Sequence, residues 1–190
     1  MKAMRVGLLC MVIVALSISV GHAQEQQWSV TVKGGLLLPG GVTIEGSDFD
    51  TNMGFLGNAY FDAMVAPKLS IGGFLQMALP SVTAWGDDYG VTVTTIGATM
   101  KGRFPLQSGW VLRPGLAFGY QMTSTDAPDA DGTNGLDIGG MFEIIKPLAN
   151  STNALVGELG FMTQPSGGNS DVDVTWGPIF YFAFGYQFGG

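Results

Sequence analysis

The last segment of the chain alternates between two kinds of side chain. From Trp176 to Phe188 every even-numbered residue is aromatic or proline, whereas the odd-numbered residues are mostly small or polar. A period of two puts alternate residues on opposite faces of a β-strand, so this segment predicts a strand with one aromatic face. The other face, with Ala183, Gly185 and Gln187, suits a crowded or wet space. A strand that lies between lipid and the lumen of a barrel has two faces of this kind.

The same alternation recurs along the chain, with turn-forming residues between the runs. It predicts eight strands, at residues 28–39, 53–66, 69–80, 90–104, 110–123, 135–147, 154–164 and 174–188. Helical periodicity is absent after residue 23. We therefore expect an all-β fold, an eight-stranded antiparallel up-and-down transmembrane β-barrel in which the first and last strands pair.

The connections between these strands alternate in length. Three are short, at residues 66–69, 105–109 and 148–153, and four are longer and polar, at residues 40–52, 81–89, 124–134 and 165–173. Transmembrane barrels have short turns at one end and longer loops at the other. A soluble meander has no reason to sort its loops in this way, so the pattern favours a membrane barrel with a short-turn end and a long-loop end.

The composition of the two faces indicates which one meets lipid. The polar face carries mainly Gly, Ala, Ser and Thr with scattered single charges, which suits a narrow lumen better than a solvated surface. The alternative is a secreted soluble barrel of the lipocalin type, with its apolar face inside and a densely charged face outside. We favour the lipid-facing arrangement, in which these apolar residues point outward: Leu116, Phe118, Phe142, Phe161, Phe182 and Phe184.

The first 23 residues predict a cleaved signal peptide. They contain a basic start, an apolar run too short to span a membrane as a helix, and a small-x-small sequence that ends at Ala23. Residues 24–190 would then form a single barrel domain. Because the only cysteine and histidine of the chain, Cys10 and His22, lie in the predicted signal peptide, the mature chain would lack thiol and histidine catalysis and metal sites of the His/Cys type.

The charge of the chain excludes further classes. Charged residues make up 12% of the sequence, against about a quarter in ordinary soluble domains. The net charge of −7 argues against nucleic-acid binding. We expect no enzymatic activity and no cofactor, although Glu143 and Glu158 would face each other across neighbouring strands and leave a carboxylate pair as an alternative.

Seven charged residues of the polar face share a level, a few residues from the short-turn end of their strands. They are Lys33, Asp62, Lys101, Arg103, Arg113, Glu143 and Glu158, and we name them the lumen belt. Ionised groups inside a narrow barrel must pair, since an isolated buried charge is very costly. Hairpin geometry predicts Lys33 near Asp62 and Arg113 near Glu143. The belt is either a selectivity ring or an ion-paired plug, and we favour the plug because an eight-strand lumen is normally packed.

Aromatic residues gather at both strand ends, as in the interfacial girdles of membrane barrels. The short-turn end carries Trp28, Phe104, Trp110, Tyr186 and Phe188, and the long-loop end carries Trp85, Tyr89 and Trp176. The long loops are acidic, and residues 129–135 faintly resemble a calcium loop without its spacing. We interpret these acids as a solvated rim.

With its signal peptide, eight alternating strands, sorted loops and aromatic strand from Phe180 to Phe188, the chain resembles the small bacterial outer-membrane β-barrels, such as the OmpA transmembrane domain, OmpX and OmpW. The resemblance implies a bacterial outer-membrane location, with membrane lipid and the assembly machinery that recognises the C-terminal strand as partners. The chain departs from the pattern of this family, whose members commonly end on an aromatic residue, because Gly189 and Gly190 follow Phe188.

The function that we expect is a structural or surface-interaction role for a monomeric barrel. The alternatives are a narrow pore or conduit for small, including apolar, solutes and the soluble lipocalin-like binding barrel.

Overall fold

The computed structural model describes residues 28–84, 86–127 and 131–189. The predicted signal peptide lies outside these residues. All the regular structure in the described part of the chain is β-strand. None of its segments is a helix long and apolar enough to cross a membrane.

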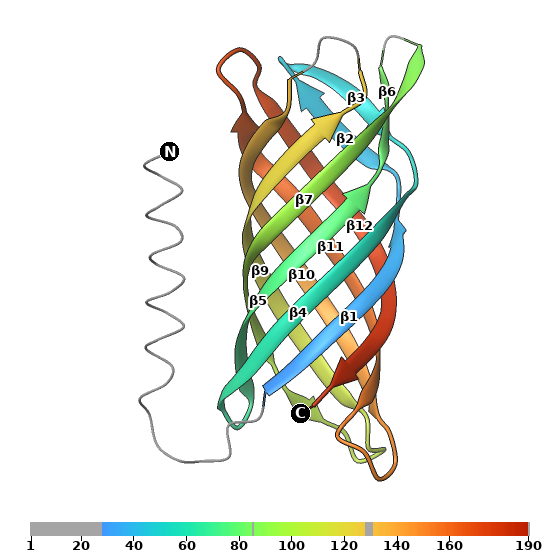
Figure 1. Ribbon diagram of the computed structural model, residues 1–190, viewed down its shortest axis with the longest axis vertical. Coiled ribbons are helices and arrows are strands. Elements are labelled where there is room, and N and C mark those ends of the chain that lie inside the picture. The colour runs from blue at the N-terminus through green and yellow to red at the C-terminus, as the bar shows by residue number, and fades with distance from the viewer. Residues whose placement is uncertain (1–27, 85, 128–130, 190) are drawn as a thin grey trace.

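Eight long strands form a closed antiparallel ring (Figure 1). They are β1 (Trp28–Leu37), β4 (Gly54–Ala66), β5 (Leu69–Leu79), β7 (Asp87–Gly102), β9 (Val111–Thr125), β10 (Thr133–Pro147), β11 (Ala154–Gly168) and β12 (Val174–Phe188). Each pairs with the next along the chain, and β1 pairs with β12 to close the ring. The predicted eight-stranded antiparallel barrel is confirmed. Closure leaves no strand edge without hydrogen-bond partners, which lipid requires.

Four short strands extend this ring. They are β2 (Gly40–Ile44), β3 (Ser47–Thr51) and β6 (Ser81–Ala84) at the long-loop end, and β8 (Phe104–Pro105) at the short-turn end. β2, β3 and β6 continue β1, β4 and β5 upward and pair in the order β12-β2-β3-β6-β7. The barrel wall therefore continues past the level at which three of its strands are interrupted.

The predicted loop at residues 40–52 is wrong, because most of it forms the β2–β3 hairpin. Glu45 and Gly46 connect the two strands with φ angles of 51° and 78°. Positive φ at both central residues defines the type I′ turn, whose twist matches paired strands. Pro39 and Pro80 lie at the interruptions, where a proline removes a backbone donor from the ladder.

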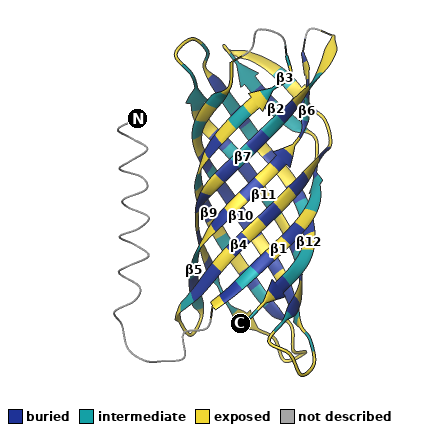
Figure 2. Ribbon diagram, viewed as in Figure 1, coloured by how far each residue is buried: buried dark blue, intermediate teal, exposed yellow. Residues whose placement is uncertain are grey.

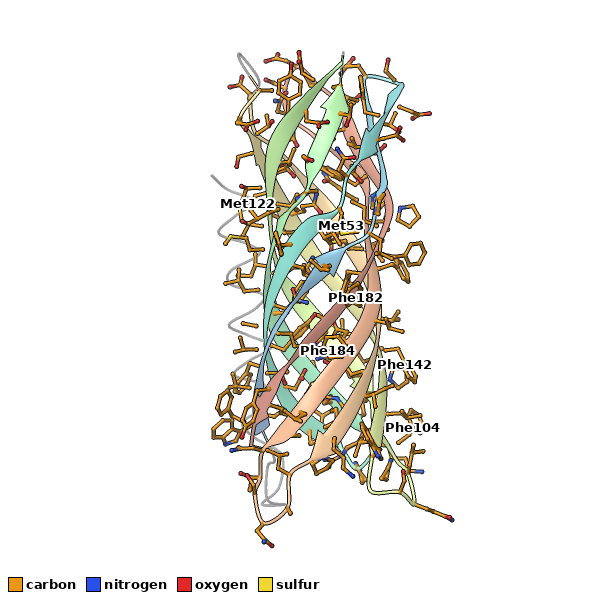
Figure 3. The ribbon with its side chains drawn as sticks, turned by 90° about the vertical axis from the view of Figure 1, so that its right-hand side faces the viewer. Met53, Phe104, Met122, Phe142, Phe182 and Phe184 are labelled. Carbon is orange, nitrogen blue, oxygen red and sulfur yellow. The ribbon has the colours of Figure 1, made fainter. Side chains whose placement is uncertain are left out.

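The pleat of the strands separates exposed residues from buried ones along the wall of the barrel (Figure 2). Exposed and buried residues alternate along every long strand. The outer face carries large apolar side chains, and Figure 3 shows Phe142, Phe182 and Phe184 projecting from the wall. Leu116, Phe118, Phe142, Phe161 and Phe184 are exposed and Phe182 is half-buried. A soluble lipocalin-like barrel would hold these residues inside, so that alternative is wrong.

The prediction that Trp176 belongs to the outer aromatic girdle is wrong. Its side chain is 5% exposed and lies inside the barrel. The ladder between β11 and β12 shifts register here: Gln164 faces Trp176, whereas Met162 faces Ile179. Three residues of β12 thus span two of β11. This β-bulge exchanges the inner and outer faces, so Trp176 does not share the outer face of Phe180 to Phe188.

The upper half of the lumen, toward the long-loop end, is filled by apolar side chains. We name this cluster the upper core: Leu37, Val42, Leu56, Ala78, Val82, Ala84, Val91, Val93, Met162, Val174, Trp176, Ile179, Tyr181 and Ala183. The partly buried Tyr89 packs against it, so Tyr89 does not form an outer girdle. The sequence predicted an inner face of small and polar residues, and the upper half departs from that prediction.

Candidate functional site

The lower half of the lumen holds the lumen belt, and six different strands bring its charges together. β1 provides Lys33, β4 Asp62, β7 Lys101, β9 Arg113, β10 Glu143 and β11 Glu158. The ladders place Glu143 directly opposite Arg113 on one side and opposite Glu158 on the other. These six residues are at most 6% exposed.

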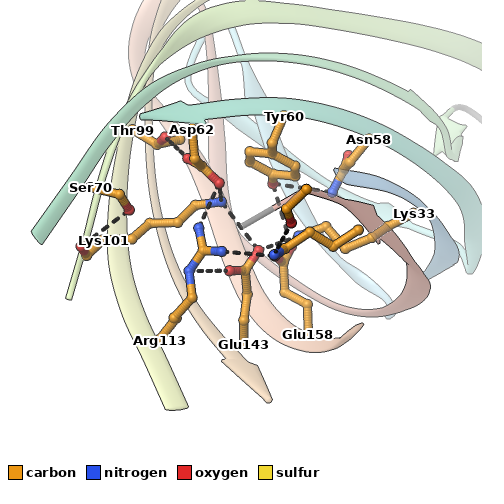
Figure 4. Close-up of polar contacts among 12 residues, drawn as sticks. Lys33, Asn58, Tyr60, Asp62, Ser70, Thr99, Lys101, Arg113, Glu143 and Glu158 are labelled. Atoms are coloured by element: carbon orange, nitrogen blue, oxygen red, sulfur yellow. Dashed lines mark hydrogen bonds and ion pairs between the residues drawn. The ribbon is translucent and has the colours of Figure 1, made fainter. Parts of the chain in front are cut away.

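Glu143 is the centre of the ion-pair network (Figure 4). Its Oε1 lies 2.6 Å from Lys33 Nζ and 3.2 Å from Lys101 Nζ, and its Oε2 lies 3.2 Å from Arg113 Nε. One buried carboxylate thereby contacts the three cations. Each contact spans the lumen or a strand ladder, so the network joins separate parts of the wall.

The other two acids complete the network. Asp62 Oδ2 accepts from Lys101 Nζ at 3.0 Å and from Arg113 Nη2 at 2.5 Å. Glu158 pairs with Lys33. Three cations and three acids therefore neutralise one another in the buried interior. Buried charges are tolerated only with such pairing.

One of the two predicted neighbour pairs is present and the other is not. Arg113 and Glu143 pair as the hairpin geometry predicts. Lys33 contacts Glu143 and Glu158 and not Asp62, because the β1–β4 register places Lys33 opposite Asn58 and Asp62 opposite Ser29. The long lysine side chain reaches across the lumen instead of along the wall.

Tyr60 lies at the centre of the belt, a role that the sequence reasoning missed. The Nζ atoms of Lys33 and Lys101 each lie 3.9 Å from its ring centroid. Its hydroxyl donates to Glu158 Oε1 at 3.4 Å. Both lysines thus make cation–π contacts with one ring. One sequence feature points to this role: Tyr60 lies two residues before Asp62, on the polar face of the same strand.

Arg103 lies lower than the other belt residues. It is half-buried and lines a cavity together with Asp62 and Arg113. Its backbone N–H donates to the carbonyl of Lys68 in the turn between β4 and β5, which places Arg103 at the mouth of the lumen at the short-turn end.

The residues of the predicted girdle at the short-turn end lie on the outer wall. Trp28, Trp110 and Phe188 are exposed, and Tyr186 is half-buried with its ring centroid 4.8 Å from that of Phe188. Trp85, predicted for the opposite girdle, lies outside the described residues.

A buried polar contact lies at the level of the upper core. Gln121 Nε2 donates to Gln164 Oε1 at 2.5 Å, and Gln164 lies opposite Trp176 in the β11–β12 ladder. Asp137 is also buried, and its Oδ1 has no hydrogen-bond partner among the described residues. No group of three or more His, Cys, Asp or Glu side chains in the described part of the chain is arranged to hold a metal ion.

Comparison with known proteins finds similarity in structure alone. No family model matches the chain, and no curated protein matches it in sequence. Among solved structures, the chain is similar to the outer membrane protein OprG of Pseudomonas aeruginosa, with 12% identity and a TM-score of 0.57 over 90% of this chain and 98% of that one.

Two further barrels match at a comparable level. Neisserial surface protein A (NspA) has 10% identity and a TM-score of 0.60, over 85% of this chain and 96% of that one. A major outer membrane protein from Thermus thermophilus has 14% identity and a TM-score of 0.58, over 88% of this chain and 100% of that one. The chain therefore has the fold of the small bacterial outer-membrane β-barrels.

Proposed function

We propose that this outer-membrane β-barrel has a structural or surface-interaction role, without a catalytic reaction, and that its lumen is closed to ions. The observation that carries the proposal is the buried network around Glu143, in which three cations and three acids pair across the lumen. Eight strands enclose an interior just wide enough for side chains to fill. In this barrel the lower half is filled by charged groups and the upper half by the upper core.

A conducting pore needs a continuous wet path, and the interior offers two obstacles to one. Between Gln121 and Trp176 the space enclosed by the side chains holds no volume for a water molecule. Below it, the belt residues span the lumen with their side chains. A barrel with a filled lumen serves as a rigid, lipid-embedded support for the loops and turns at its two ends.

Conductance in planar bilayers tests the proposal. The mature chain is refolded in detergent and reconstituted, and the expected result is the absence of unit conductance across a range of voltages and salt concentrations. Insertion is checked in parallel by co-flotation of the protein with lipid vesicles. Steady, ion-selective conductance of the inserted protein would replace the closed barrel with the narrow-pore alternative.

A further inference from the structure

The charges of the barrel are segregated along its axis. All the Lys and Arg side chains of the described residues lie toward the short-turn end: Lys33, Lys68, Lys101, Arg103, Arg113 and Lys146. Only three described acids lie there, and these are the belt residues Asp62, Glu143 and Glu158. The other described acids lie nearer the long-loop end. The short-turn end is thus positive in a protein whose net charge is −7.

A cavity of about 120 Å³ lies in this positive region, directly beneath the belt. Arg103 and Arg113 both line it, so two guanidinium groups bring positive charge to the same small space. An anion between two guanidinium groups neutralises part of their charge and accepts charge-assisted hydrogen bonds from both.

Among the residues of the cavity wall, Arg113 has hydrogen-bond donors to spare. A guanidinium carries five N–H groups, and Arg113 directs single contacts from Nε, Nη1 and Nη2 to Glu143, Gln187 and Asp62. Hydroxyl groups of Ser29, Ser151 and Thr152 also line the cavity.

The single acid in the lining is already engaged. Asp62 Oδ2 accepts from Lys101 and Arg113, and its Oδ1 accepts from Thr99 Oγ1 at 3.3 Å. The cavity therefore offers donors and positive charge to a ligand, without an uncompensated carboxylate to repel it.

We propose that this cavity binds one phosphate-type oxyanion. A tetrahedral oxyanion has several oxygens and accepts hydrogen bonds from different directions, which suits donors that come from β1, β9, Arg103 and the turn between β10 and β11. The phosphate is either a free ion or the headgroup of a phospholipid that reaches the short-turn end. The site is independent of conduction, since it lies on one side of the belt.

Calorimetric titration of the refolded mature barrel with inorganic phosphate, in a phosphate-free buffer and a non-ionic detergent, tests the site. The expected result is saturable binding of one phosphate per barrel. Arg103→Gln should weaken this binding by about tenfold or more, the typical effect of losing a hydrogen bond to a charged group. Lys68→Gln is the matched control, because it removes the same charge from an exposed turn at the same end; its effect should stay below about twofold.

A second variant keeps the test informative if Arg103→Gln does not fold. Ser29 is buried, and Ser29→Ala removes a lining hydroxyl without changing the charge, so it should weaken phosphate binding several-fold. Absence of saturable binding in the wild type would overturn the proposal. So would an equal loss in the Lys68→Gln control, or binding of acetate tighter than that of phosphate.

The same titration in lipid nanodiscs distinguishes the two sources of phosphate. Nanodiscs of phosphatidylglycerol and of phosphatidylcholine are compared, and the phosphate titration is repeated in each. Competition by either lipid assigns the site to a headgroup, and undiminished binding assigns it to the free ion.

Discussion

Glu143 contacts Lys33, Lys101 and Arg113, and these contacts make the lumen belt dependent on each of its members. A buried ion pair adds little stability by itself, because the desolvation of both charges offsets their attraction. Loss of one partner is different, since the charge left behind is buried without compensation.

Arg113→Ala leaves Asp62 with one cation and removes a contact from Glu143. We expect the free energy of unfolding to fall by about 3–5 kcal/mol. Urea unfolding in lipid vesicles, followed by tryptophan fluorescence, measures the change. Lys68→Ala, at an exposed turn residue, should change it by less than about 0.5 kcal/mol. Equal changes in the two variants would contradict the structural role of the belt.

Glycine at position 185 makes room for the stem of a belt lysine. It lies opposite Lys33 in the β1–β12 ladder, and a Cβ there would lie 2.6 Å from Lys33 Cγ and 2.0 Å from the carbonyl oxygen of Val32. Gly185→Ala should therefore destabilise the barrel by about 1–3 kcal/mol, the usual cost of overpacking. Gly57→Ala is the control, because its Cβ would meet no atom within 4 Å. The same urea unfolding measurement compares them, and indifference to Gly185→Ala would show that the lysine stem can move aside.

The level and face of the belt residues are readable from the sequence, whereas their pairing is not. Period-two alternation places Lys33 and Glu158 on the inner face, and their distances from the short turns place them at one level. The choice of partner depends on which walls face each other across the lumen. Alternation along single strands contains no information about the strands across the lumen, so it predicts the neighbouring Asp62 as the partner of Lys33 and misses Glu143.

At the scale of the strands, β12 shows both the strength and the limit of alternation. From Phe180 to Phe188 the period-two pattern gives the outer face correctly. It fails at Trp176 because the bulge at Gly177 and Pro178 changes the phase. A proline within a strand is itself a signal for a bulge or an edge. The same kind of signal, at Pro39 and Pro80, lies at the ends of two predicted strands and marks the interruptions between β1 and β2 and between β5 and β6.

The outer row of β12 predicts a depth-dependent cost for charge. Phe184 is 68% exposed and lies at the middle of the outward row between Phe180 and Phe188. Phe184→Arg should destabilise the barrel by about 2–4 kcal/mol, whereas Phe188→Arg, near the short-turn end, should cost about 0–1 kcal/mol. Unfolding in lipid vesicles measures both. Similar losses of stability in the two variants would mean that Phe184 does not lie deeper in the hydrocarbon of the membrane than Phe188.

At the scale of the whole molecule, the belt and the upper core occupy the lumen at two levels. The long connections of the sequence did not reveal the upper core, since its residues come from β2 and β6 as well as from the long strands. Under the proposed function each of them closes the lumen, and this proposal has a consequence for permeability: removal of one closure leaves the other in place.

Planar bilayers test this arrangement with single and double substitutions. Arg113→Ala and Trp176→Ala should each leave the barrel non-conducting, because the upper core or the belt still fills its half of the lumen. The variant with both substitutions should show ion leakage. Conductance of Arg113→Ala alone, equal to that of the double variant, would mean that the upper core does not exclude water.

Because β1 pairs with β12, the first and last strands of the chain are neighbours in the ring, and the chain could begin at another strand without changing the ring. Trp28 and Gly189 meet at the short-turn end, where a Cβ on Gly189 would lie 2.8 Å from the Trp28 carbonyl oxygen. A short linker could join these ends, and new ends could be opened at the turn between Pro67 and Lys68 without removing a single ladder. Circular permutation would then turn the seam of the barrel into an ordinary hairpin and give β5 the place of the first strand.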